Sequence, residues 1–202
     1  MPTFHTYCLF FAPFALSLGG CSSQPDVRSH LGDGNEGHPR SIGESESFFI
    51  AVRGDEFERG DIGSDLVATN VFVEIGADHV VYSKRYILFW TEDVIPEMEI
   101  STVDRKKISE ENYKAIRQRL SHYLPSAHSN KDMVLTPKGC SVPLHSVSQA
   151  SVTFGTRFRE AHGAFVFPRE CTTSSGKVVR DDLNAILKSL PPLEGLGGYQ
   201  IE

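Results

Sequence analysis

Among the residues whose types and positions could do chemistry, the first to examine is Cys21. It ends the stretch Leu18-Gly19-Gly20-Cys21, which closes an apolar run that begins near Tyr7. The run is shorter than the roughly 20 apolar residues that span a bilayer, but its length suits the core of a secretory signal peptide. Two glycines before the cysteine leave the backbone open to a peptidase. The thiol of Cys21 is a nucleophile and could be alkylated. A serine or an alanine at this position could not be modified in the same way.

A leucine three positions before a cysteine, with small residues between them, resembles the lipobox of bacterial lipoprotein precursors. The resemblance implies that the chain is cleaved between Gly20 and Cys21, that Cys21 receives a thioether-linked diacylglyceryl group, and that the new amino terminus is acylated, palmitate being a typical acyl chain. The alternative is a buried N-terminal helix with an incidental cysteine. No charged side chain precedes Asp26, which argues against a helix with one solvated face.

The same resemblance implies a place in the cell envelope, held to the membrane by lipid. Several acyl chains on one residue give stable attachment, whereas a single chain is marginal. Ser22 and Ser23 follow Cys21, where an aspartate would mark retention at the inner membrane of Gram-negative bacteria. We therefore expect the periplasmic face of the outer membrane rather than the inner membrane.

The remaining thiols predict a disulfide bond. Cys8 would leave with the signal peptide and Cys21 would carry lipid, so the mature chain keeps Cys140 and Cys171. In an oxidising compartment these two are expected to pair, which would stabilise the fold by roughly 3 to 4 kcal/mol. A pair of free buried thiols is the alternative. A metal site is disfavoured because neither cysteine has a Cys or His partner at C-x-x-C spacing.

Composition excludes some classes of partner. The chain is 40% hydrophobic and 23% charged, with a formal net charge of -6, so it can build a core and repels phosphate backbones. No cluster of Lys and Arg with interleaved aromatic residues offsets that charge, and nucleic acid is therefore not an expected partner. No motif for a cofactor is present, and none is predicted.

The hydrophobic patterns predict one α+β domain. We expect a signal peptide over residues 1–20, a flexible tether over 21–47, where large apolar residues are scarce, and a single globular domain over 48–202. Within it, an antiparallel sheet of five or six strands packs against two helices and is pinned by one disulfide. The expected strands are 48–52, 71–75, 80–83, 86–91, 147–154 and 164–167, and 99–103 is a further candidate. The expected helices begin at Ser109, ending at Pro125, and near Val178, ending at Leu190.

Three other motifs receive structural interpretations. Arg-Gly-Asp occurs at 53–55 and at 59–61, and glycine beside aspartate favours a turn rather than an adhesion tripeptide. The acidic stretch 92–99 lacks the alternating oxygen ligands and the glycine of a calcium loop, so it is interpreted as a solvated turn. The stretch 173–177 resembles the end of a phosphate loop but has Cys171 and Val178 at two required positions. Ser174 or Ser175 is expected to cap the last helix instead.

Two classes of function remain. The first is a binding or structural role, in which the anchored domain recognises, and could inhibit, an envelope protein. The second is a small envelope hydrolase whose Ser/His/Asp site assembles in space without a sequence motif, with His145 or His162 as its histidine. No G-x-S-x-G or H-E-x-x-H motif is present, so no catalytic residue is assigned and the binding role is favoured.

Overall fold

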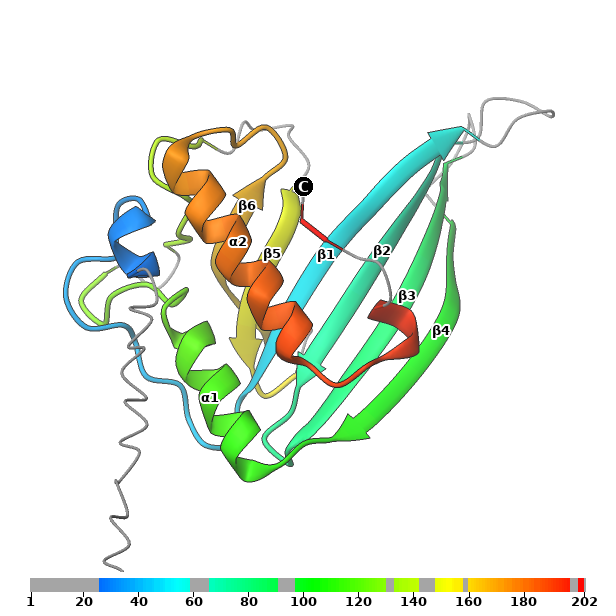
Figure 1. Cartoon of the computed structure of the whole chain (residues 1–202), viewed down its shortest axis with the longest axis horizontal. Coiled ribbons are helices and arrows are strands. Elements are labelled where there is room, and N and C mark those ends of the chain that lie inside the picture. Colours follow the sequence, from blue (N-terminus) through cyan, green and yellow to red (C-terminus); the bar gives the residue numbers. More distant parts are fainter. Residues whose placement is uncertain are drawn as a thin grey trace, which may run out of the picture.

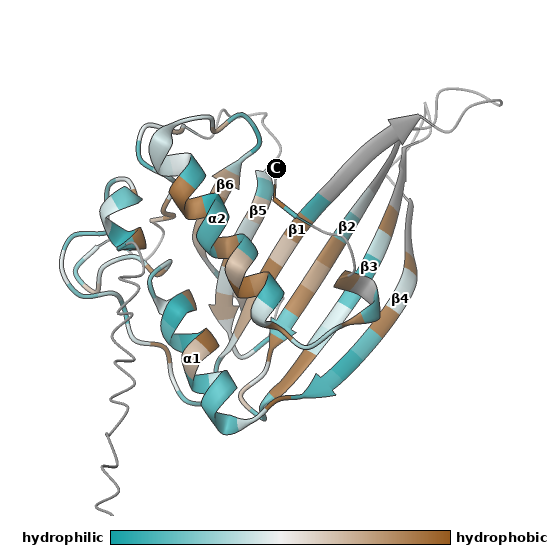
Figure 2. Cartoon of the chain, viewed as in Figure 1, coloured by the Kyte–Doolittle hydropathy of each residue, from teal (hydrophilic) through white to brown (hydrophobic). Residues whose placement is uncertain are grey.

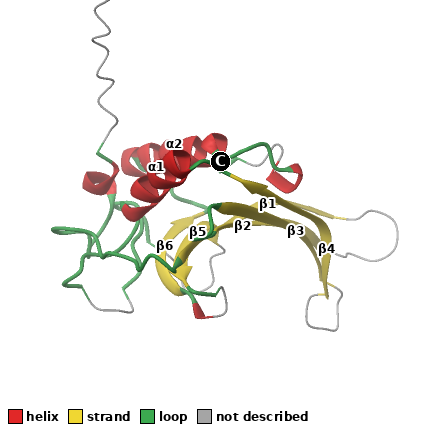
Figure 3. Cartoon of the chain, turned by 90° about the horizontal axis from the view of Figure 1, so that it is seen from below, coloured by secondary structure: helices red, strands yellow, loops and turns green. Residues whose placement is uncertain are grey.

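The protein folds as a six-stranded antiparallel sheet with two α-helices on one side of it (Figures 1 and 3). The computed structural model describes residues 26–58, 66–90, 97–129, 133–141, 148–157, 160–196 and 200–201. Strand order is β4-β3-β2-β1-β5-β6. The predicted α+β class, sheet and pair of helices are thereby confirmed.

The elements follow one another without strict alternation of strand and helix. In chain order they are η1 (Val27–His30), β1 (Ser47–Glu58), β2 (Leu66–Ile75), β3 (Val80–Trp90), β4 (Glu97–Lys107), α1 (Glu110–Ser121), β5 (Ser148–Gly155), β6 (His162–Pro168), α2 (Ser174–Ser189) and η3 (Glu194–Leu196). Neighbouring strands pair antiparallel throughout the sheet.

The hydrophobic core lies between the sheet and the helices. On β1, Phe48, Ile50 and Val52 alternate toward it and are almost completely buried, as the two-residue period of a strand requires. They share one cluster with Leu183 and Ile186 of α2. In Figure 2 the hydrophobic residues gather on the strands behind the helices, whereas hydrophilic and hydrophobic residues mix along β4.

The strands are longer than the sequence pattern indicated. The runs expected at 80–83 and 86–91 are joined, as far as Trp90, in one interior strand, β3, which pairs with both β2 and β4. The turn interpretation of the first Arg-Gly-Asp is wrong, because residues 53–55 lie within β1. The pairing shifts there from Arg53 with Asn70 to Glu56 with Ala68, so β1 has one extra residue, a β-bulge. Residues 59–61 and 92–96 lie outside the described residues, while 97–99 belong to β4.

Side-chain caps define where both helices begin. Ser109 caps α1 as expected, and its hydroxyl accepts a hydrogen bond from Asn112 N. The helix ends at Ser121, earlier than expected from Pro125. The cap of α2 is Thr173, not Ser174 or Ser175, because the Thr173 hydroxyl accepts a 3.0 Å hydrogen bond from Gly176 N. This helix begins about one turn before the predicted start.

The expectation of a flexible tether over 21–47 is wrong for residues 26–47. Val27 and Leu31 are 2% and 1% exposed and belong to the core cluster. Backbone hydrogen bonds join this segment to the loops after α1, such as Gly32 N to Thr136 O at 2.8 Å and Ser126 N to Gly34 O at 2.7 Å. Two apolar anchors and this backbone pairing offset the ordering entropy that the polar composition suggested would prevail.

Candidate binding surface

The second face of the sheet, opposite α1 and α2 in Figure 3, is built on two stacked phenylalanines. Phe49 of β1 and Phe72 of β2 are 1% and 9% exposed but lie outside the core cluster, because alternation directs them away from the helices. Their ring centroids are 5.8 Å apart with an interplanar angle of 23°. They give this face a rigid apolar base.

Around this base, strand register places a group of aromatic, aliphatic and charged residues on the same face. Lys84 of β3 pairs with Phe72 on one side and with Val103 of β4 on the other. The flanking rows follow the same register, and paired residues in an antiparallel sheet share a face. We call this group the sheet patch; it comprises Phe72, Glu74, Tyr82, Lys84, Tyr86, Ile100, Val103 and Arg105.

The outer part of the sheet patch exposes aliphatic side chains that a solvated edge strand does not require. Ile100 and Val103 of β4 are each 50% exposed, and with Val134 they are the large hydrophobic residues exposed in the described part of the chain. Tyr82 and Tyr86 beside them are half-buried. Tyrosine and arginine on a partly apolar surface are the composition enriched at protein–protein interfaces.

One charge of the sheet patch, Lys84, lies over an aromatic ring. Lys84 Nζ lies 5.1 Å from the centroid of the Tyr82 ring, in cation–π geometry. A hydrogen bond with Tyr82 raises the pKa of Lys84. Partial burial raises the pKa of Glu74, an effect that its hydrogen bond with Ser47 opposes. The group therefore offers two cations, an anion and two phenol rings for contacts.

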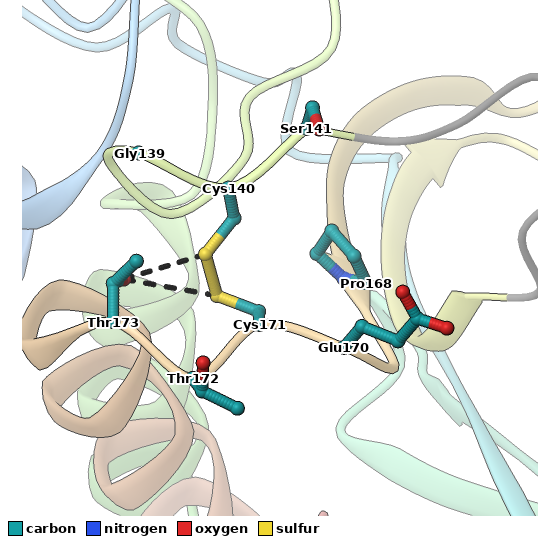
Figure 4. Close-up of a pocket in the computed structure, with 8 residues that line it drawn as sticks. All are labelled: Gly139, Cys140, Ser141, Pro168, Glu170, Cys171, Thr172 and Thr173. Carbon is teal, nitrogen blue, oxygen red and sulfur yellow. Dashed lines mark hydrogen bonds between the residues drawn. A yellow bond between two sulfur atoms is a disulfide. The ribbon is translucent and has the colours of Figure 1, made fainter.

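The predicted disulfide is present between Cys140 and Cys171, with Cα atoms 5.4 Å apart (Figure 4). The Thr173 hydroxyl lies beside both sulfurs, 3.3 Å from Cys140 Sγ and 4.0 Å from Cys171 Sγ. The bond fastens the loop before β5 to the connection between β6 and α2. The adjoining pocket of about 210 Å³ is smaller than the roughly 300 Å³ at which small-molecule sites begin. We assign the disulfide a structural role.

A second hollow, of about 430 Å³, lies between residues 39–42 and α1. One of its lining cations, Arg117, donates to Glu46 O at 2.7 Å, to Gly43 O at 2.6 Å and to Tyr113 Oη at 2.8 Å. A second, Lys114, forms an ion pair with Glu110 within α1. The Arg117 contacts hold the N-terminal segment against α1, so this arginine has a structural role.

Of the two histidines proposed for a hydrolase, the structure describes only His162, and among the described residues its hydrogen-bond partners do not form a triad. His145 lies outside the described residues, and His162, exposed at the start of β6, packs its ring 5.6 Å from that of Phe154. A different pair meets: His30 Nδ1 lies 3.3 Å from Ser175 Oγ, but within the described residues no carboxylate hydrogen-bonds to His30. Nor does the described part contain a group of three or more His, Cys, Asp or Glu able to hold a metal ion.

Gly20 and Cys21, the predicted cleavage and lipidation residues, lie outside the described residues. No helix in the described ranges is both long and apolar enough to cross a membrane. Comparison with known proteins finds no matching family, no matching characterised protein and no matching solved structure.

The sheet patch was not predicted from the sequence because its members come from three strands. The exposed pair Ile100 and Val103 was visible only as part of an expected strand.

Proposed function

We propose that this protein is a lipid-anchored lipoprotein of the cell envelope whose domain binds a partner protein through the sheet patch. Attachment would come through Cys21, as the lipobox-like sequence implies. The periplasmic face of the outer membrane is the proposed location. The observation that supports binding is the half-exposure of Ile100 and Val103 beside two tyrosines, on the sheet face opposite α1 and α2.

Physical arguments favour a macromolecular partner over a small ligand. The sheet patch is formed by residues in register on adjacent strands, so its side chains stand on a rigid base that needs little ordering upon binding. Apolar residues there would be removed from water by a partner, at about 25 cal/mol per Å². The charges of Lys84, Glu74 and Arg105 would set the orientation of the partner more than its affinity.

Binding is tested by a pair of matched substitutions. Val103→Asp places a charge in the exposed aliphatic part of the sheet patch, whereas Val134→Asp makes the same change at a 40% exposed valine beside Gly163 of β6, at the other edge of the sheet. Photo-crosslinking in the envelope, with the full-length protein, should yield a specific adduct. We expect Val103→Asp to abolish it and Val134→Asp to retain it, with both proteins equally stable. Loss or retention in both variants would contradict a role of the sheet patch.

Attachment is tested separately. Mass spectrometry of the protein from cells should show a chain that begins at Cys21 with diacylglyceryl and acyl groups, and Cys21→Ser should retain an intact Met1. An unmodified sulfur at position 21 would overturn the anchor without affecting the binding test. Labelling of the purified domain by a serine-reactive probe would count against the binding role and in favour of a hydrolase.

A further inference from the structure

The N-terminal segment is fastened to the domain by two arginines acting from opposite sides. Arg28, within the segment, donates to His122 O and Leu124 O at 3.0 Å each, at the end of α1. Arg117, on α1, donates to the backbone at Gly43 and Glu46, as described above. Partial burial, which removes water from the charged form, lowers the pKa of the Arg28 guanidinium.

Backbone pairing continues this attachment along the segment. Arg40 N donates to Pro125 O at 2.8 Å, and Lys138 N donates to His30 O at 2.8 Å. Lys138 directly precedes the loop that the disulfide closes through Cys140. The part of the chain from Asp26 onward therefore belongs to the folded domain and adds nothing to the length of a tether.

Chain length then limits the distance between the domain and its proposed anchor. From Cys21 to Asp26 there are five residue steps, which span at most roughly 17 Å, whereas a tether reaching Ser47 would span roughly 90 Å. A domain of this size has a diameter of roughly 40 Å. The available tether is shorter than the domain it holds.

The point where the tether meets the domain lies far from the sheet patch. In Figures 1 and 3, η1 lies beside the helices at one end of the long axis, and β4 lies at the other end. A short tether attached beside η1 brings that end to the bilayer first, with β4 directed away from the membrane.

We propose that the lipid anchor holds the η1 end of the domain against the lipid surface, so that the sheet patch faces the aqueous compartment and receives a partner from there. This inference rests on the proposed function, because it takes Cys21 as the lipid-bearing residue. It adds that the domain has one orientation and stays close to the membrane. The partner must therefore approach the membrane surface to bind the sheet patch.

Energy transfer to the membrane tests this orientation. The lipidated protein is purified from cells, reconstituted in vesicles of phosphatidylethanolamine with a minority of phosphatidylglycerol, and labelled at Ser29→Cys or Ser101→Cys. Both serines are exposed, one in η1 and the other in β4, and the native thiols remain in their disulfide. With acceptor dyes on the lipid headgroups, we expect transfer to be several-fold higher from position 29 than from position 101. Equal transfer, or higher transfer from position 101, would overturn the proposed orientation.

An insertion outside the described domain provides the matched control. About 20 Gly and Ser residues between Ser23 and Gln24 would lengthen the tether by an r.m.s. span of roughly 25 Å without touching a described contact. Transfer from position 29 should then fall toward that from position 101; no fall would show that tether length does not set the distance. If Cys21 bears no lipid, the protein stays unbound to vesicles and its mass shows this directly, so failure of the anchor is distinguishable from failure of the orientation.

Discussion

The Tyr123 hydroxyl donates a 2.7 Å hydrogen bond to Asp182 Oδ2, which joins the turn after α1 to the middle of α2. The other carboxylate oxygen, Asp182 Oδ1, accepts a 2.6 Å hydrogen bond from Arg119. Tyr123 is fully buried and Asp182 is 8% exposed. Residues of α1 and of the turn after it thus donate hydrogen bonds to both oxygens of the buried Asp182 carboxylate, which lies on α2. These bonds fix how the two helices lie on the sheet.

Removal of this carboxylate should weaken the fold. We expect Asp182→Ala to lower the free energy of unfolding by about 2 to 4 kcal/mol, because it leaves a buried hydroxyl and a half-buried guanidinium without their acceptor. Urea denaturation measures the change. The exposed neighbour Asp181→Ala should change stability by less than about 0.5 kcal/mol. Equal effects from the two substitutions would contradict a specific role for the network.

Tyr123 should make the fold sensitive to alkali. Burial, and next the Asp182 charge, raise the pKa of Tyr123 well above its ordinary value. Above about pH 10 the Tyr123 hydroxyl loses its proton in the unfolded chain but keeps it in the folded chain. The stability that this difference contributes is therefore fully present below that pH and is lost as the pH rises. In the wild-type protein the free energy of unfolding should decline by up to about 1.4 kcal/mol per pH unit in this range, and Tyr123→Phe should remove that decline. Urea midpoints between about pH 9 and pH 11 test this, and parallel curves for the two proteins would refute it.

Gly176, in the first turn of α2, should resist replacement by alanine. Helix propensity alone would favour alanine by up to about 1 kcal/mol. A Cβ at this position, however, would lie 2.4 Å from Cys171 Sγ and 3.0 Å from Cys171 O. We therefore expect Gly176→Ala to destabilise the protein by about 1 to 3 kcal/mol in urea denaturation.

The disulfide supplies the control for this substitution. Cys140→Ala with Cys171→Ala should itself lower stability by about 3 to 4 kcal/mol, since it opens a loop between residues 31 apart. In that background the cost of Gly176→Ala should shrink, because the nearest atom, Cys171 Sγ, has been removed. An unchanged cost would mean that the sulfur is not the obstacle.

The sequence predicted those parts of the fold that are governed by local pattern. The Ser109 cap followed from a hydroxyl before two glutamates, and the disulfide from the two cysteines that remained after the proposed leader and anchor were set aside. Strand lengths and the bulge at 53–56 were missed because they depend on the neighbouring strand. Thr173 was missed as a cap because two serines beside it offer the same chemistry, and tertiary contacts decide among them.

The candidate site was harder to predict than the fold. Val103, Lys84 and Phe72 are far apart in sequence, and only the register of three strands places them in one row. Residues 26–47 were mispredicted for a related reason. Their composition is that of a tether, but two buried apolar side chains, two arginines and several backbone hydrogen bonds hold them to the domain. Composition averages over such a segment and conceals the few residues that decide its state.

Deletion of residues 26–46 separates these two interpretations of the N-terminal segment. A tether could be removed without loss, but Val27 and Leu31 bury apolar side chains worth about 1.5 to 3 kcal/mol each. We expect a chain that begins at Ser47 to be less stable in urea than one that begins at Gln24, by at least about 3 kcal/mol. The smaller change Leu31→Ala should lower the free energy of unfolding by about 2 to 4 kcal/mol. Ser29→Ala, at an exposed position, should leave the free energy of unfolding nearly unchanged. Equal stability of the two chains would restore the tether interpretation and, with it, a long reach from the membrane.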